Sequence, residues 1–440
     1  MNLKSHRSMI IFLIAAVVVF IVVQALFSTG ILTTFWSTII RIGAVMAIVS
    51  LGLNLIYGFN GQFSLGQWGF YAIGAYTAAD ITYRWSINKS ADGLVVVLLG
   101  TGLAGLAIIL LRRALSRVRG LDALSAFGLY FLAVLALGYL AVILGRAITP
   151  GVTGLLQALP PNIAMQLVFV LAVLLGGLIA AEISFLFGLP VLTLGSDYFG
   201  IATLGLTIIV KVLLDNSDTM LGFAEMKGAR GMIGIPKLTS WFWVFFFLVL
   251  VVIITRNLLH SSYGRAIVSV REDEIAAKAM GIDVAHYKNL TFVLGSFFAG
   301  LAGALYAHIN GFLHPNTFNF IQSFNPMIIV VFGGLGSVTG TLAASFTWAL
   351  VLEGFLRLFL PDGFETWRFV VYPLLLLLLM LLRPKGLFGD IEIPFLRQYL
   401  PPMSLKAPAR MEEDLEPAAV EGISTFANPG ENPPAKEAAE

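Results

Sequence analysis

The chain has 440 residues, with 27 Lys and Arg against 25 Asp and Glu, a formal net charge of +2, and no cysteine. Only 12% of its residues are charged and 58% are apolar, whereas soluble domains are about 25% charged. A soluble fold of this length could not bury so much apolar surface. The composition excludes soluble, disordered and disulfide-stapled proteins, and the balanced charge argues against nucleic acid as a partner. It indicates an integral membrane protein.

The apolar runs predict an all-α bundle, because each lipid-exposed backbone group must be bonded within its own helix. A crossing takes about 20 mostly apolar residues. The first run is longer than the core of a signal peptide, so we expect it to be a retained span. Two short runs, 198–214 and 323–335, contain Gly or Pro and would be re-entrant or broken. We expect between ten and twelve transmembrane helices, and the candidate runs are 9–28, 36–57, 63–83, 93–111, 126–145, 164–187, 198–214, 239–256, 288–309, 323–335, 337–360 and 366–382.

Glycines alternate with polar side chains in the segment that connects the second and third of these runs. Polar groups at membrane depth either bond to other helices or line a wet cavity. Both interpretations stay open here: close structural packing, or contact with a translocated solute. The candidate translocation residues are Asn60, Gly61, Gln62, Ser64, Gly66 and Gln67.

The distribution of Lys and Arg predicts the orientation. Basic residues gather before the first span, after the fourth, in the long polar loop 258–290 and after the last span. Positively charged loops face the cytoplasm, so both termini and loop 258–290 are expected there. Residues 1–389 would form the permease domain. Residues 390–440 are rich in Pro, Ala and Glu and are predicted to be a disordered cytoplasmic tail.

A short amphipathic helix is predicted within loop 258–290. Ser269 and Glu272 have the spacing of a capping box that would begin this helix. Gly281 stands where a left-handed residue would end it, and Asp283 would cap the following membrane helix. The helix would present a narrow apolar stripe, formed by Ile275, Ala276, Ala279 and Met280.

The apolar stripe requires a partner. Acidic residues balance the basic ones in this loop, which disfavours an anionic lipid surface. A groove on a cytoplasmic protein is the alternative, a helix-in-groove contact. The candidate docking surface comprises Arg271, Glu272, Asp273, Glu274, Ile275, Ala276, Ala277, Ala279, Met280 and Gly281.

The stretch 264–283, GRAIVSVREDEIAAKAMGID, resembles the coupling loop of permeases from ABC importers of the branched-chain amino acid type. In that family the loop carries Glu-Ala-Ala, followed after three residues by Gly. Here Ile275, Ala276 and Ala277 precede Gly281, and the acid is displaced to Glu274. Further blocks that are similar to the family lie at 54–79, 195–214, 297–324, 330–346 and 383–389.

The resemblance implies a multi-pass permease of the bacterial inner (plasma) membrane that moves branched-chain or similar apolar amino acids into the cell. It implies a transport subunit and not an enzyme. The implied partners are the lipid bilayer, a second homologous permease, two cytoplasmic ATPase subunits and an external solute-binding protein. ATP and Mg would be bound by the ATPase subunits, with no cofactor on this chain. Motion of the ATPases would pass through Gly281 into the membrane helix that begins near Val284.

Three alternatives remain open. A membrane enzyme would need a metal site or a pair of acid–base residues, and the sequence shows neither. A related ABC permease for urea, short amides or a simple sugar would have the same architecture. An ion-coupled carrier would need an acidic group near the membrane midplane. The sequence contains no Gly-Lys dipeptide of a phosphate-binding loop, and its five histidines show no zinc-site spacing. We interpret the few ionisable residues within spans as interfacial or structural: Arg41, Asp80, Glu182, Lys211 and Glu353.

Overall fold

The computed structural model describes residues 3–115, 123–192, 196–219 and 224–359, together with residues 374, 381, 382, 386, 392 and 393. This part of the chain is almost entirely helical. Its long helices are α1 (Leu3–Ser28), α2 (Thr34–Leu53), α3 (Gln67–Asn88), α4 (Asp92–Leu115), α5 (Ala123–Gln157), α6 (Pro161–Val191), α7 (Ser196–Asp215), α8 (Trp241–His260) and α11 (Val284–Asn310). The shorter helices are α9 (Ser262–Glu272), α10 (Glu274–Ala279), α12 (Phe324–Gly333), α13 (Val338–Trp348) and α14 (Leu356–Phe359).

Short segments join these helices. Two π-helical turns, η1 (Asn54–Phe59) and η6 (Ala349–Phe355), extend α2 and α13. Residues β1 (Met232–Ile233) and β2 (Phe312–Leu313) form an antiparallel pair in which Met232 faces Leu313. The 3-10 turns are η2 (Ala224–Met226), η3 (Gly228–Arg230), η4 (Pro315–Phe318) and η5 (Phe320–Ser323).

The predicted spans from 9–28 to 337–360 each coincide with a helix, which confirms the all-α prediction. In the described part of the chain, nine helices are long and apolar enough to cross a membrane. Helix α3 has 22 residues but is more polar, and the short run 323–335 forms the 10-residue helix α12. The run 198–214 is a continuous helix, α7, and not a broken one. The last span, 366–382, and most of the tail 390–440 lie outside the described residues.

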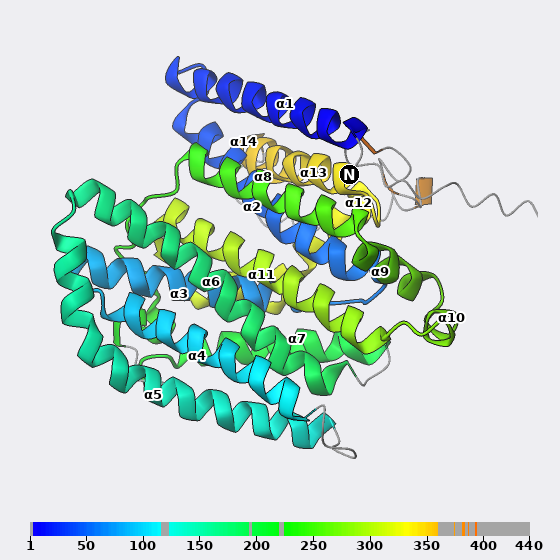
Figure 1. Cartoon of the computed structure of the whole chain (residues 1–440). Coiled ribbons are helices and arrows are strands. Elements are labelled where there is room, and N and C mark those ends of the chain that lie inside the picture. Colours follow the sequence, from blue (N-terminus) through cyan, green and yellow to red (C-terminus); the bar gives the residue numbers. More distant parts are fainter. Residues whose placement is uncertain are drawn as a thin grey trace, which may run out of the picture. The chain divides into compact units, whose positions relative to one another are not determined.

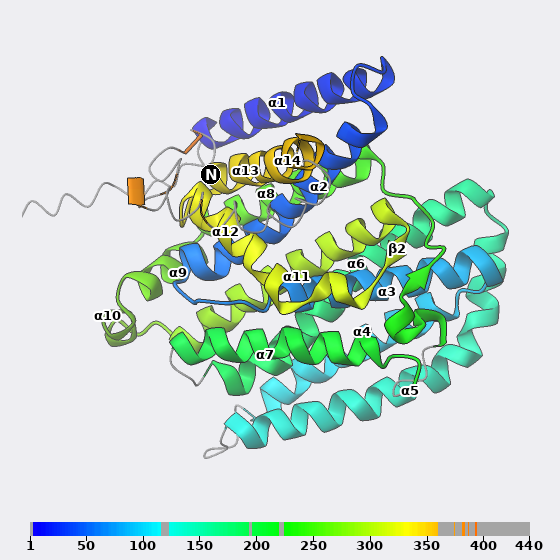
Figure 2. The same cartoon turned by 180° about the vertical axis from the view of Figure 1, so that it is seen from behind.

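Helix α11 lies at the centre of the membrane helices (Figure 1) and packs against α2, α3 and α6. Helices α4 and α5 lie against each other on one side, and α1 covers α8 on the other, as the reverse view also shows (Figure 2). Helices α2 and α11 are largely buried, whereas α1 and α5 are almost entirely exposed. Exposed apolar helices suit a bilayer and not water, because lipid replaces the missing protein partners.

Glycines let the central helices approach each other closely. A Cβ added at Gly295 on α11 would lie 2.6 Å from the carbonyl oxygen of Gly52 on α2. A Cβ at Gly300, one turn and a half further along α11, would lie 2.7 Å from the carbonyl oxygen of Gly176 on α6. Membrane helices associate through such backbone contact, because no hydrophobic effect drives them together inside lipid.

Replacing Gly300 with valine is therefore expected to destabilise the fold by about 1–3 kcal/mol, the usual cost of overpacking. The measurement is the thermal unfolding midpoint of the detergent-solubilised protein. Gly102→Ala is the matched control, because a Cβ at Gly102 on α4 would meet nothing within 4 Å. This control should keep or raise the midpoint. An unchanged midpoint for Gly300→Val would show that the interface yields without cost.

Ion pairs connect the C-terminal end of α3 to its neighbours. Arg84 forms ion pairs with Asp80 at 2.9 Å, with Asp92 at 3.1 Å and with Glu225 at 2.9 Å. These contacts connect α3 to the beginning of α4 and to η2 in the loop between α7 and α8. Arg84 is half-buried and pairs with three carboxylates, and such charge-assisted contacts are strong. They account for the two charged residues, Asp80 and Arg84, in a helix that otherwise resembles an apolar span.

Candidate functional site

Asp273, and not Ser269, begins the helix that carries the apolar stripe. Helix α9 continues through Ser269 to Glu272, and the Ser269 hydroxyl donates to a backbone carbonyl three residues earlier at 2.8 Å. The Asp273 carboxylate accepts from the N–H groups of Ile275 and Ala276, each at 2.9 Å. The predicted capping box was wrong because a serine inside a helix bonds back to the preceding turn, while an aspartate directly before a helix is a strong N-cap.

The connection from α10 to α11 has the geometry that the sequence predicts. Gly281 adopts a left-handed conformation with φ of +81°. The Asp283 carboxylate accepts from the His286 N–H at 3.1 Å and caps α11. Glu274 forms an ion pair with Lys288 at 2.6 Å, across the turn. The first turns of α10 and α11 are thus tied together on either side of Gly281.

The apolar stripe of α10 is exposed. Ile275 is 83% exposed and Met280 is 82% exposed, and Ala276 and Ala279 are exposed beside them. Only Ala277, on the opposite face, is buried. Helix α10 projects from one end of the membrane helices (Figure 1). Two large apolar side chains on a short polar helix form the kind of patch that a partner protein covers, and the docking role stays a prediction.

Arg271 differs from its neighbours in the predicted docking surface, because its side chain points back to the membrane helices. Its Nη1 donates to the carbonyl oxygen of Gly58 in η1 at 2.7 Å. Its aliphatic part closely approaches Gly61, and its guanidinium also pairs with Glu272 at 2.7 Å. Glu272, Asp273 and Glu274 are exposed. Arg271 therefore connects α9 directly to the segment that follows α2.

Five of the six candidate translocation residues lie in the connection between η1 and α3, and Gln67 begins α3; all of them except Gly61 are buried. Asn60 donates to Gln62 at 3.0 Å and to Thr291 on α11 at 2.8 Å. Gly61 is left-handed, and Gly66 packs against α7. Ser64 accepts from the Gly66 N–H at 3.4 Å. These bonds favour a structural role for Asn60 and Gln62.

Gln67 is the exception among them. It is buried, and neither its amide nitrogen nor its amide oxygen has a hydrogen-bond partner. An unpaired buried amide costs free energy unless water or a ligand satisfies it. The prediction that solute passes this segment is therefore best supported at Gln67, the first residue of α3.

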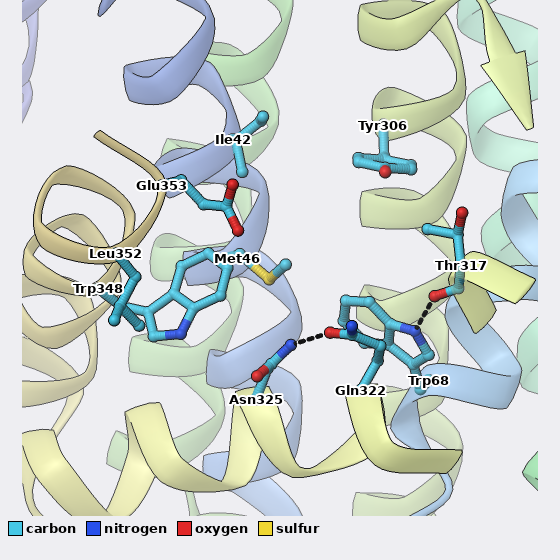
Figure 3. Close-up of a pocket in the computed structure, with 10 residues that line it drawn as sticks. All are labelled: Ile42, Met46, Trp68, Tyr306, Thr317, Gln322, Asn325, Trp348, Leu352 and Glu353. Atoms are coloured by element: carbon cyan, nitrogen blue, oxygen red, sulfur yellow. Dashed lines mark hydrogen bonds between the residues drawn. The ribbon is translucent and has the colours of Figure 1, made fainter. Parts of the chain in front are cut away.

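Trp68, which follows Gln67 in the chain, lines a cavity of about 250 Å³ (Figure 3). Helices α2, α3, α11 and α12, the turns η4 and η5 before α12, the last residue of α13 and the π-helical turn η6 contribute to its wall. Apolar and polar side chains share it. The lining residues are Ile42, Met46, Trp68, Tyr306, Thr317, Gln322, Asn325, Trp348, Leu352 and Glu353.

Hydrogen bonds fix one side of the cavity. The Trp68 indole donates to the Thr317 carbonyl oxygen at 2.9 Å, and Asn325 donates to Gln322 (Figure 3). On the other side, the indole nitrogen of Trp348 is buried and has no hydrogen-bond partner. The 3-10 turns η4 and η5 line this side of the cavity; irregular backbone between membrane helices is tolerated where it is buried in protein or lines a cavity.

No sequence pattern predicted this cavity. Glu353 was predicted to be interfacial or structural, and its carboxylate lies at the cavity wall (Figure 3). Two signals could have found the site. An ionisable residue within a span is a candidate functional residue, and the run 323–335 was too short for a full crossing. Neither signal says which helices meet there, because that depends on tertiary packing. Among the residues with described positions, no group of three His, Asp or Glu could hold a metal ion.

Comparison with known proteins identifies the family. The family described as "Branched-chain amino acid transport system / permease component" matches residues 35–148 and 120–381. The chain belongs to this family. As a permease component, it is a multi-pass membrane protein, in agreement with its apolar helices.

Relatives support the assignment over most of the chain. The high-affinity branched-chain amino acid transport system permease proteins LivM of Salmonella typhimurium and of Escherichia coli are each 27% identical to it, over 86% of this chain and 74% of theirs. The corresponding BraD protein of Pseudomonas aeruginosa is 22% identical over 80% of this chain and 94% of its own. LivH of Escherichia coli is 27% identical over 41% of this chain. No solved structure matches the chain.

Proposed function

We propose that this permease is the membrane subunit of an ATP-driven ABC importer that carries branched-chain amino acids into the cell across the bacterial inner membrane. In this assembly α9 and α10 face the cytoplasm and dock onto an ATPase subunit. An external solute-binding protein delivers the amino acid. The ATPase subunits bind ATP and Mg and hydrolyse the nucleotide; the permease binds no cofactor.

The exposed stripe on α10 is the observation that carries the proposal. Ile275 and Met280 are almost fully exposed on a helix outside the membrane bundle, and an apolar helix face is suited to a groove on a partner. Arg271 connects the same region to Gly58 within the bundle. A push on α10 and α9 would therefore reach η1, directly before the segment that leads to α3, through a direct hydrogen bond.

The names of the relatives support the proposed solute and the proposed second permease. Their names state branched-chain amino acid transport, and similarity to both LivM and LivH supports a pair of homologous permeases. A permease for urea, short amides or a simple sugar would keep the α10 surface and differ in the solute. The amino acid is favoured because the cavity combines apolar walls with a carboxylate and amides.

An ion-coupled carrier is the second candidate, and Glu353 is the observation that favours it. This acid lines a cavity between membrane helices, where a transported cation or proton would be held. The α10 stripe has no function in such a carrier, which is why we rank the importer first.

Reconstitution into proteoliposomes separates these candidates. The permease pair, the ATPases and the binding protein would be assembled together, and uptake of radiolabelled leucine measured with ATP inside. Uptake should require ATP and persist when ionophores collapse the ion gradients. Uptake that follows a proton or sodium gradient without ATP would overturn the importer and favour the carrier. ATP-dependent uptake of urea or a sugar, with no leucine uptake, would replace only the solute.

A further inference from the structure

We propose that the cavity between α2, α3, α11 and α13 is a binding site in the permease itself for a zwitterionic α-amino acid with an aliphatic side chain. The inference rests on the proposed function and deepens it, since the permease would then select its solute after the binding protein has released it. Glu353 would receive the ammonium group, and the Trp348 indole or the Gln322 amide would receive the carboxylate.

Hydrogen-bond donors for a carboxylate lie on the cavity wall. The Trp348 indole N–H is buried, only 8% of the residue is exposed, and the nitrogen has no hydrogen-bond partner. Indole nitrogens are donors only, and a buried donor without a partner is costly. Gln322 accepts from Asn325 with its carbonyl oxygen, which leaves its amide N–H groups for another acceptor. A ligand carboxylate would satisfy one of these donors.

Acceptors for an ammonium group also line the cavity. The Glu353 carboxylate faces it, and Asn325 lines it as well; the Asn325 nitrogen donates to Gln322, so its side-chain oxygen takes no part in that bond (Figure 3). A carboxylate and an amide oxygen are groups that receive ammonium hydrogens. Their presence beside donors favours a ligand that carries both charges over a simple anion or cation.

The size and the apolar surface limit the ligand further. Ile42 and Met46 from α2 form an apolar part of the cavity wall. An aliphatic side chain packed against them would be removed from water, which is favourable. The cavity volume of about 250 Å³ lies just below the range of about 300–1,000 Å³ that accommodates drug-sized ligands. A single small amino acid therefore suits the site, and a peptide does not.

The test uses the full complex in proteoliposomes, with labelled leucine as the probe. Glu353→Gln removes the charge at nearly constant shape, and Trp348→Phe removes the N–H. Each should lower the rate of leucine uptake by about thirtyfold or more, because a buried charged partner loses its counterpart. Co-purification of the ATPase subunits with the tagged permease should match that of the unmodified complex, which shows that the variants fold and assemble.

Two controls match these variants. Glu182→Gln changes an acid within α6 that does not line the cavity, and Trp241→Phe removes another buried indole N–H, on α8, that has no hydrogen-bond partner. Both should transport normally. Ile42→Phe fills the cavity and should reduce leucine uptake more than alanine uptake, a change of specificity that a merely structural role would not produce.

The outcomes separate the site from the proposed function. Normal leucine uptake in Glu353→Gln and Trp348→Phe, with an active unmodified complex, would overturn the site and leave the importer intact. The site would also be overturned if Ile42→Phe reduced leucine and alanine uptake equally and if Glu353→Gln and Trp348→Phe both lowered the amount of permease in the membrane. An unmodified complex that never transports an amino acid with ATP would remove both proposals.

Discussion

Replacing Ile275 with glutamate is expected to abolish ATP-driven leucine uptake while the amount of permease in the membrane stays unchanged. Ile275 is 83% exposed and contributes nothing to the packed core, so the variant should fold. In the proposed importer the same side chain is buried against an ATPase subunit. Loss of an interface anchor costs about 2 kcal/mol or more, and burial of an unpaired charge adds to it. Such a loss weakens association by about thirtyfold or more.

The measurement is co-purification of the ATPases with the tagged permease, together with uptake. Ile31→Glu is the matched control, because Ile31 is also an exposed apolar side chain, 70% exposed. It lies in the α1–α2 connection, at the other end of the helices from α10 (Figure 1). The control should retain its ATPases. Full association and uptake in Ile275→Glu would show that the ATPases bind elsewhere.

Replacing Gly281 with proline is expected to stop transport through the backbone alone. Gly281 has φ of +81°, whereas proline requires about −65°. Its N–H also donates to the Lys278 carbonyl oxygen at 3.0 Å, and proline would remove that bond. A Cβ at this position would meet nothing within 4 Å, so no steric clash contributes. The connection between α10 and α11 would have to rearrange, and the movement of α10 would no longer be passed to α11.

Gly281→Asn is the control variant: it removes the glycine but can keep the left-handed backbone conformation. Asparagine enters the left-handed region at little cost, while other residues lose about 1–2 kcal/mol there. Uptake should fall by about tenfold or more for proline and stay near normal for asparagine. ATP hydrolysis without uptake would be the signature of uncoupling in the proline variant. Equal uptake by the two variants would mean that the left-handed turn is not needed for transmission.

The loop between α8 and α11 shows how far local sequence patterns reach. The left-handed Gly281 and the Asp283 cap followed from the residues themselves, and both are confirmed. The first helix boundary was misplaced, since Ser269 and Asp273 are both acceptable caps in isolation. The choice between them depends on α9, which packs Ile267 and Val270 against the rest of the protein. That packing extends α9 through Ser269 and leaves Asp273 to begin α10.

The amino-acid sequence alone determined that this is an all-helical membrane protein. It also located the apolar runs that form the helices, the left-handed turn at Gly281 and the Asp283 cap. Those properties depend on apolar run length and on backbone preferences of single residues, which are local. Tertiary structure alone decided that Arg271 reaches Gly58, that Asn60 bonds to Thr291, and that Glu353 and Trp68 share one cavity. These residues are far apart in the chain, and which of them meet depends on how close the glycine-lined faces of α2, α6 and α11 let the helices come.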